Sequence, residues 1–177
     1  MASRRKGRIL AFQALYSWEA AGYRLKKPPA PERRKIPEGL LDFSWLETEK
    51  RAGLDEGTAN FSRLLVAGTI ENIDPVDEMI RRHLKNWDFS RLNRVDLAVL
   101  RMSVYALMYQ NDVSPSIIID EAIGIAKEFG ADDSFRFVNG VLDSIRKTIR
   151  DDTAKENPDT TEALPSYGSS GAPPGGG

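Results

Sequence analysis

The sequence predicts an all-α fold, and three observations lead to this prediction. Between residues 58 and 150, apolar residues recur every three or four positions, which is the period of an amphipathic helix. Residues 3–20 follow the same period and contain no proline. No segment alternates apolar and polar residues for long enough to predict a strand. With 177 residues, of which 41% are apolar, we expect one domain with a substantial core.

The first predicted helix, residues 3–20, joins a basic start to an apolar body. Four of its first residues are cations: Arg4, Arg5, Lys6 and Arg8. A helical wheel places four residues on one stripe, with a second apolar side opposite: Arg5, Ile9, Phe12 and Tyr16. A helix that is apolar on two sides is expected to pack between other elements. Its cations are expected to reach water or an anion, because a cluster of unpaired charges cannot be buried.

Prolines interrupt the helical pattern after this first helix. Pro28, Pro29 and Pro31 exclude a continuing helix and favour an extended, solvated loop. Residues 22–57 are therefore predicted to form a Pro-rich insertion between two core helices, with one short helix at residues 40–51. Three further cations either remain solvated in this insertion or assist a basic face: Arg33, Arg34 and Lys35.

Capping residues predict where the next helices begin. Thr58 is expected to cap one helix, and Asp74 the next, with Pro75 as its first helical residue. Residues 93–110 are apolar almost all round, which predicts a buried central helix rather than a membrane span.

The last two helices are predicted from the same kinds of signal. Ser114 and Pro115 open the first of them, and Gly130 ends it. Either Asp132 or Asp133 caps the final helix, which is expected to end near residue 150. Residues 151–177 are rich in glycine, proline and aspartate, and are expected to be disordered because they cannot bury enough apolar surface. The predicted domain is therefore residues 1–150.

The charges separate along the chain. Residues 1–35 hold ten lysines and arginines against two glutamates, a net charge of +8, and the remaining residues carry −9. A basic arm on an acidic body indicates a polyanionic partner for the arm. The alternative is a solvated, disordered terminus.

The composition limits the cellular compartment and the kinds of chemistry that we expect for this protein. Cysteine is absent, so disulfides and thiol chemistry are impossible. No secretory apolar segment and no apolar run near ~18 residues occurs, and we expect a cytoplasmic protein without a membrane partner. His83 is the single histidine and is expected to be non-catalytic. The chain has no zinc-ligand set and no phosphate-binding glycine loop, so we expect no cofactor, no metal and no enzyme activity. Asp132 and Asp133 could act as acid and base, although a helix cap explains them more simply.

Three segments resemble the NusB family of bacterial transcription antitermination factors. They are RRKGRILAFQALYSWE at residues 4–19, RVDLAVLRMSVYAL at residues 94–107 and IIIDEAIGIAKEFGADDSFRFVNGVLDSI at residues 117–145. The resemblance covers about residues 3–18 and 58–149. The insertion is longer and richer in proline than the family norm, and the tail has no counterpart.

The resemblance implies two packed helical bundles of about six to seven helices. It implies binding of boxA-like, single-stranded RNA together with the ribosomal protein NusE. Other Nus factors and RNA polymerase complete the assembly, which reads through terminators, notably in ribosomal RNA operons.

Carried over by position, the resemblance also implies two sets of site residues. The RNA-binding set is Arg4, Arg5, Lys6, Arg8, Tyr16, Asp96 and Phe137. The partner-binding set is Asp133, Ser134, Arg136 and Phe137. Arginines bind phosphates and aromatic rings stack on unpaired bases, so the chemistry fits. Structural roles stay open, because Tyr16 could be a core residue and Asp133 only a cap.

Two other functional classes stay open. A similar domain precedes some RNA cytosine methyltransferases, but no cofactor-binding βαβ region or catalytic cysteine occurs in this sequence. A helical scaffold that binds only proteins is the second alternative, and the basic arm argues against it.

Overall fold

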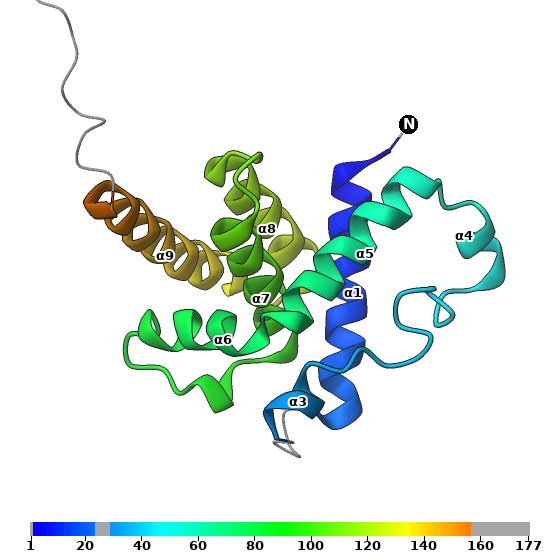
Figure 1. The fold of residues 1–177 in the computed structure, drawn as a ribbon, viewed down its shortest axis with the longest axis horizontal. Helices are drawn as coiled ribbons and strands as arrows, with labels where there is room; N and C mark the ends of the chain where they lie inside the picture. Colours follow the sequence, from blue (N-terminus) through cyan, green and yellow to red (C-terminus); the bar gives the residue numbers. More distant parts are fainter. Residues whose placement is uncertain (1, 24–28, 157–177) are drawn as a thin grey trace, which may run out of the picture.

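A computed structural model of the chain describes residues 2–23 and 29–156 (Figure 1). Within these residues it contains eight α-helices and no strands, so the all-α prediction is confirmed. The six long helices are α1 (Arg4–Trp18), α5 (Glu56–Glu71), α6 (Ile73–Arg82), α7 (Arg94–Tyr109), α8 (Pro115–Phe129) and α9 (Ser134–Glu156). The short elements are η1 (Glu19–Tyr23), a π-helix, α3 (Ala30–Arg33), α4 (Thr48–Ala52) and η2 (Phe89–Arg91), a 3₁₀-helix.

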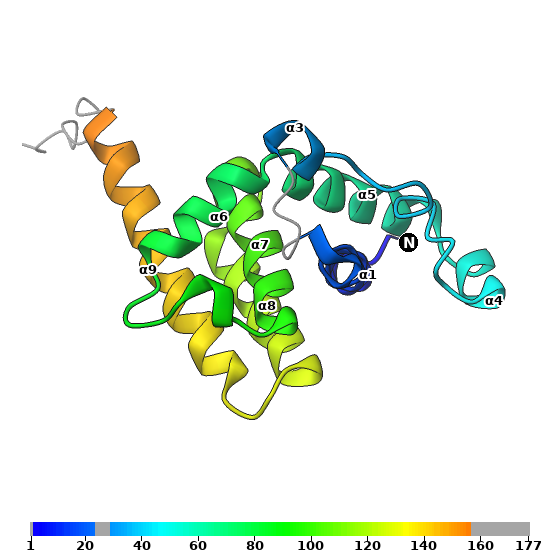
Figure 2. The same cartoon turned by 90° about the horizontal axis from the view of Figure 1, so that it is seen from below.

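Helix α7 lies at the centre, as its sequence predicts. It contacts α1 and α5 on one side and α6, α8 and α9 on the other. The pairs α1–α5 and α8–α9 therefore belong to two packed bundles that share α7 (Figure 1). The two views agree that α4 and the C-terminal end of α9 lie at opposite ends of the molecule (Figure 2).

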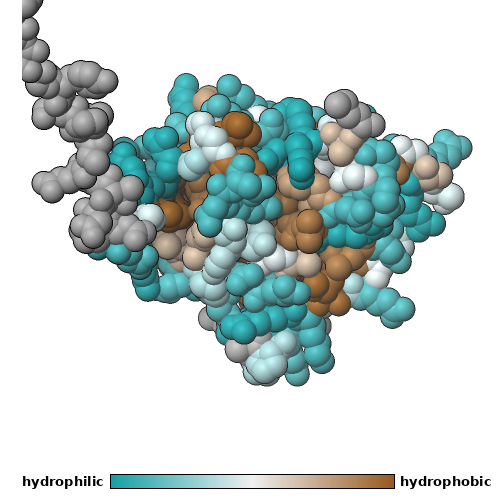
Figure 3. Space-filling view, turned by 45° about the horizontal axis from the view of Figure 1, so that its top comes forward, coloured by the Kyte–Doolittle hydropathy of each residue, from teal (hydrophilic) through white to brown (hydrophobic). Residues whose placement is uncertain are grey.

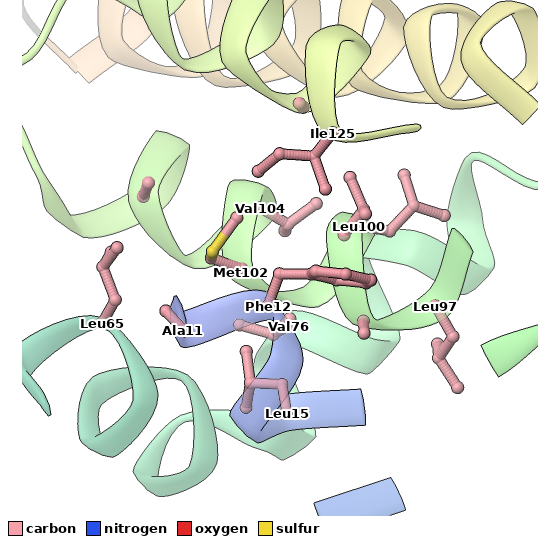
Figure 4. Packing of buried hydrophobic residues seen from close by; sticks show 14 of the residues in the cluster. Ala11, Phe12, Leu15, Leu65, Val76, Leu97, Leu100, Met102, Val104 and Ile125 are labelled. Atoms are coloured by element: carbon pink, nitrogen blue, oxygen red, sulfur yellow. The ribbon is translucent and has the colours of Figure 1, made fainter. Parts of the chain in front are cut away.

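A single main core joins the two bundles. Figure 4 shows Phe12 and Leu15 of α1 close to side chains of α7, with Ile125 of α8 on the far side. Leu97 and Leu100 of α7 are fully buried in this cluster. The prediction that α1 packs between other elements is confirmed, because α1 contacts α5, α7 and α8.

Two predicted helix starts are wrong. Helix α5 begins at Glu56 rather than after Thr58, because the Asp55 carboxylate accepts a hydrogen bond from the Thr58 amide at 3.0 Å and caps the helix. Helix α6 begins at Ile73, two residues earlier than the Asp74 cap implied. Asp74 instead lies in its first turn.

The Pro-rich insertion is more closely packed than a solvated loop. The helix expected at residues 40–51 is replaced by turns and by α4, which contains no buried residue. Leu40 and Phe43 are buried, and Phe43 forms a small second core with Leu10 and Ala59. Residues 24–28 of the insertion lie outside the described part of the chain.

The last helix continues beyond its predicted end near residue 150. Helix α9 runs to Glu156, and residues 157–177 lie outside the described part of the chain. None of the helices in the described residues is both long and apolar enough to cross a membrane. On the face drawn in Figure 3, hydrophilic side chains cover most of the surface and hydrophobic ones form separate patches.

Candidate nucleic-acid interface

The basic start of α1, which we call the head (Arg4, Arg5 and Lys6), is the first helical turn itself. Ser3 caps the helix, because its side-chain oxygen accepts a hydrogen bond from the Lys6 amide at 3.2 Å. All three head side chains are exposed, and the turn contains no acidic residue. Cations at a helix N-terminus are unfavourable, because that end of the helix dipole is already positive. The head therefore does not stabilise the helix, and its charge is exposed to solvent.

Close packing holds the head against α5. A Cβ on Gly7 would lie 2.6 Å from Cδ1 of Phe61, so only glycine allows the two helices to approach this closely. The guanidinium of Arg4 lies 4.4 Å from the centroid of the Phe61 ring, a cation–π contact. The amide of Ser3 donates a hydrogen bond to Oγ1 of Thr58 at 2.8 Å. These contacts present the head from a rigid support.

Arg8 differs from the head, and its predicted exposure is wrong. Only 7% of the residue is exposed, and its guanidinium lies 5.3 Å from the Phe61 ring centroid. Burial lowers the pKa of Arg8 below its ordinary value, against the attraction of Glu121 and together with the repulsion of Arg4. Arg8 therefore supports the α1–α5 contact, and its position does not favour a direct phosphate contact.

Arg5 lies across α8. Its Nη2 is 3.3 Å from Oε2 of Glu128, and its Nη1 is 3.6 Å from Oε2 of Glu121. Gly124 permits this arrangement, because a Cβ there would lie 2.9 Å from Nη1 of Arg5. No ion pair joins Arg4 or Lys6 to a carboxylate within the described residues. The uncompensated positive charge of the head is therefore concentrated on Arg4 and Lys6.

Tyr16 lies further along the stripe of α1 that faces α8. Its ring centroid is 6.4 Å from that of Phe12, which in turn is 5.2 Å from that of Phe129 at the end of α8. The residue is 38% exposed, so a part of the ring is open to solvent. An aromatic ring with one supported side and one open side can stack with an unpaired base.

Asp96 does not lie on this surface. It is 5% exposed, and its Oδ2 accepts a hydrogen bond from the side-chain amide of Asn93 at 2.6 Å. The Asp96 amide donates to the side-chain oxygen of Asn93 at 2.8 Å, so the two residues cap α7 reciprocally. The Asp96 carboxylate therefore has a structural role in the cap of α7, and the RNA contact expected for it stays a prediction.

The turn between α8 and α9 contains the predicted partner residues. Asp133 and Arg136 are exposed and form an ion pair at 3.4 Å. Asp133 occupies the capping position of α9, where its carbonyl accepts from the Phe137 amide at 3.2 Å. Ser134 is buried, and its side-chain oxygen accepts from the Ala131 amide at 3.0 Å. The Ser134 side chain therefore closes the turn, and the partner contact expected for it stays a prediction.

Phe137 is half-buried, and its aromatic neighbour is a residue that sequence reasoning missed. The ring of Trp87, in the loop between α6 and α7, lies 5.6 Å from the Phe137 ring and is 59% exposed. The exposure of Trp87 depends on the fold, so the sequence gives no signal that this ring lies at the surface.

A buried charge cluster fixes the other end of α1. Arg101 of α7 donates two hydrogen bonds of 2.8 Å to Asp77 of α6 and one of 2.6 Å to Glu19 of η1. Burial would lower the pKa of Arg101, but the hydrogen bonds and charges of Asp77 and Glu19 raise it above its ordinary value. The cluster ties α1, α6 and α7 together, three residues beyond Tyr16.

His83 connects the end of α6 to α9 through hydrogen bonds of both ring nitrogens. Its Nδ1 lies 2.8 Å from the carbonyl oxygen of Met79, and its Nε2 lies 2.9 Å from Oγ1 of Thr148 on α9. Because a carbonyl only accepts, Nδ1 carries the proton. No group of three or more potential metal-binding side chains occurs in residues 2–23 and 29–156.

The structure thus brings together some of the predicted residues. Arg5 and Tyr16 share the flank of α1 that faces α8. The ring of Phe12 packs against Tyr16 and against Phe129, the last residue of α8 before the α8–α9 turn. Arg4 and Lys6 lie beside them on the first turn of α1. Arg8, Asp96 and Ser134 are buried and do not contribute an exposed side chain.

Comparison with known proteins identifies relatives over most of the chain. The sequence profile of the NusB family matches residues 5–147. The transcription antitermination protein NusB of Treponema denticola is 49% identical over 143 residues, which cover 81% of this chain and 95% of that protein. A solved structure of T. maritima NusB is 33% identical, has a TM-score of 0.67, and is matched over 83% of this chain and 93% of that chain. A structure of antitermination factors NusB and NusE in complex with dsRNA has a TM-score of 0.66 over 82% of this chain and 96% of that chain. At 24% identity, it shows the fold alone.

Proposed function

This chain belongs to the NusB family, and on that premise we propose that it is a transcription antitermination factor that binds RNA through the start of α1. The RNA is of the boxA type and single-stranded, and NusE binds beside it. With other Nus factors, the complex lets RNA polymerase read through terminators, notably in ribosomal RNA operons. The protein works in the cytoplasm as an adaptor and not as an enzyme.

One observation supports the RNA contact above the others. The head places three exposed cations on a capped first turn that contains no acidic residue, and the described residues supply no carboxylate partner for Arg4 or Lys6. A fold alone would favour acidic residues at this position. A phosphate backbone supplies the missing negative charge, and Tyr16 supplies a ring for a base.

The exposed pair Asp133 and Arg136, with Phe137 and Trp87, is the proposed face for NusE. The chain beyond residue 35 carries a net charge of −9, which attracts a basic ribosomal protein. The proposal no longer includes Asp96 or the Ser134 side chain, because both are buried.

The alternatives predict different results. The relatives matched over nearly their whole length are antitermination proteins, which favours this function over a methyltransferase domain. A scaffold that binds only proteins would show no RNA affinity, whereas an RNA adaptor would show an affinity that falls steeply with salt.

The test is a titration of the protein with a boxA-containing RNA, with and without NusE, followed by calorimetry of NusE binding. We expect RNA binding that NusE strengthens. Asp133→Lys should weaken NusE binding, while Asp133→Asn removes the charge without reversing it, retains a residue type that is favoured at a helix start and serves as the matched control for folding. Equal NusE binding by the folded wild type and both variants would place the partner face elsewhere, and absence of RNA binding would contradict the proposed function.

A further inference from the structure

A second group of cations, one of them half-buried and two exposed, lies at the opposite end of α1 from the head. Arg33, Arg34 and Lys35 follow the prolines of the insertion, and α3 lies near the end of α1 and the start of α6 (Figure 1). Helix α1 has 15 residues, so about 22 Å separates its two ends. These cations are thus too far from the head to bind the same phosphate.

The arginines outnumber the carboxylate that they contact. Arg34 donates to Oδ2 of Asp74 from Nε at 3.2 Å and from Nη2 at 3.0 Å, and Nη2 of Arg33 lies 3.3 Å from Oδ1 of the same residue. Two guanidinium groups share one carboxylate, which leaves a net positive charge. Lys35 is exposed and adds to it.

The contacts with Asp74 leave both arginine side chains partly open to solvent. The Arg33 and Arg34 side chains are 40% and 50% exposed, and ion pairs at such positions contribute little to stability. The ion pair with Asp74 is therefore weak enough for a phosphate to join or replace it.

The sequence around α3 points the same way. Residues 24–35 contain six cations and one glutamate, a net charge of +5 in twelve residues. So concentrated a positive charge attracts a polyanion. Tyr16 lies on α1 between the head and this end, so an RNA strand that follows α1 would meet cations, an aromatic ring and cations again.

We propose that Arg33, Arg34 and Lys35 form a second phosphate-binding site for the RNA that the head binds. The inference rests on the proposed function and deepens it, since it assigns to the insertion a longer RNA path than the head alone provides. Asp74 competes with phosphate for the same guanidinium groups, so it is an intramolecular substitute for RNA.

The test compares three variants in RNA titrations at several salt concentrations. Arg33→Ala/Arg34→Ala should lower the affinity for a boxA-containing RNA about 25-fold at 0.1 M salt and reduce the salt slope by about 1.4, as expected for two lost contacts to a single strand. Asp74→Asn should bind RNA as tightly as the wild type or more tightly, because it releases the arginines. Lys50→Ala/Arg51→Ala removes the same charge from α4 of the same insertion and should leave affinity nearly unchanged.

Each other result overturns the inference. If the two arginines only hold the insertion to α6, the arginine variant and Asp74→Asn will lose the same thermal stability and neither will change RNA affinity. Equal losses of affinity in the arginine variant and the Lys50/Arg51 control would show a general charge effect. If Arg4→Ala/Lys6→Ala loses affinity while the Arg33/Arg34 variant does not, this inference fails and the proposed function stands. No RNA binding by the wild type overturns both.

Discussion

Two helix starts lie side by side in this protein and have opposite charges. Helix α5 begins with Asp55 and Glu56, and the Asp55 carboxylate accepts hydrogen bonds from the amide and the hydroxyl of Thr58. Helix α1 begins with the head, and Ser3 of its cap donates to that same Thr58. The start of α5 satisfies the positive end of its helix dipole, and the start of α1 opposes it. The charges at the start of α5 therefore favour helix stability, whereas those at the start of α1 are expected to favour the binding of an external anion.

The arginines repeat this contrast. Arg101 is buried, and two carboxylates compensate it with three hydrogen bonds. Arg4 is exposed, packs against the Phe61 ring and has no carboxylate partner among the described residues. We therefore expect Arg101 to contribute to stability and Arg4 to contribute to binding.

The largest expected effect comes from removing a compensated cation. Arg101→Ala removes both hydrogen bonds that the buried Asp77 carboxylate accepts from Arg101 and one that Glu19 accepts, and should lower the free energy of unfolding by about 3–5 kcal/mol. Chemical denaturation measures this loss. The control is Arg82→Ala on α6, which removes an exposed pair with Glu78 and should cost less than about 1 kcal/mol. Similar losses of unfolding free energy in both variants would contradict the proposed difference between buried, compensated charges and exposed ones.

The next effect tests the contact between the two helix starts. Gly7→Ala forces a Cβ against the Phe61 ring, and should lower the free energy of unfolding by about 1–2 kcal/mol despite the better helix propensity of alanine. Gly140→Ala on α9 is the matched control, because a Cβ at Gly140 would point into open space. That variant should gain about 0.5–1 kcal/mol. Thermal unfolding of both variants tests these expectations. A Gly7→Ala variant that is more stable than the wild type would show that α1 and α5 are less closely packed than the structure indicates.

A charge reversal makes the start of α1 resemble that of α5. Lys6→Glu places a carboxylate in the first turn, and should raise the free energy of unfolding by about 0.3–1 kcal/mol while weakening RNA binding. Lys6→Gln removes the charge only and should give an intermediate value for both. A Lys6→Glu variant that is less stable than the wild type would show that the head cations serve the fold.

The smallest effect is a pH dependence at the start of α5. The hydrogen bonds from the Thr58 side chain and amide hold the pKa of Asp55 below its ordinary value. A carboxyl group with a lower pKa in the folded state stabilises the fold above its unfolded pKa of about 3.9, and loses this contribution as the pH falls through its folded pKa. The stability advantage of the wild type over Asp55→Asn should therefore shrink between about pH 5 and pH 3. Denaturation curves across this range test it, and a constant difference would contradict the assigned cause.

The sequence predicts the long helices well because their apolar periods are local. The central position of α7 follows from a run that is apolar all round, and the packing of α1 follows from its two apolar sides. Family resemblance added the arrangement into two bundles. Helix starts were less predictable, since Thr58 and Asp55 are both capping residue types and only geometry decides between them.

Burial of single polar residues could not be predicted, because it depends on distant partners. The Arg8 side chain packs against Phe61 of another helix, and Glu19 pairs with Arg101, which lies 82 positions further along the chain. Asp96 has a local partner in Asn93, and that spacing was a signal for a cap. Arg8 therefore follows three exposed cations in the sequence but is itself buried.

The most direct test of the account is the salt dependence of RNA binding by Arg4→Ala/Lys6→Ala beside the wild type. These two cations have no carboxylate partner among the described residues and lie on the capped first turn of α1. If each contacts one phosphate of a single strand, the slope of log affinity against log salt should fall by about 1.4, and the affinity at 0.1 M salt should fall about 25-fold. The thermal unfolding temperature of the variant should stay near that of the wild type, because the removal of two unfavourable charges from the helix start offsets the loss of the Arg4–Phe61 contact. An unchanged salt slope with retained affinity would contradict the claim that the uncompensated start of α1 binds RNA.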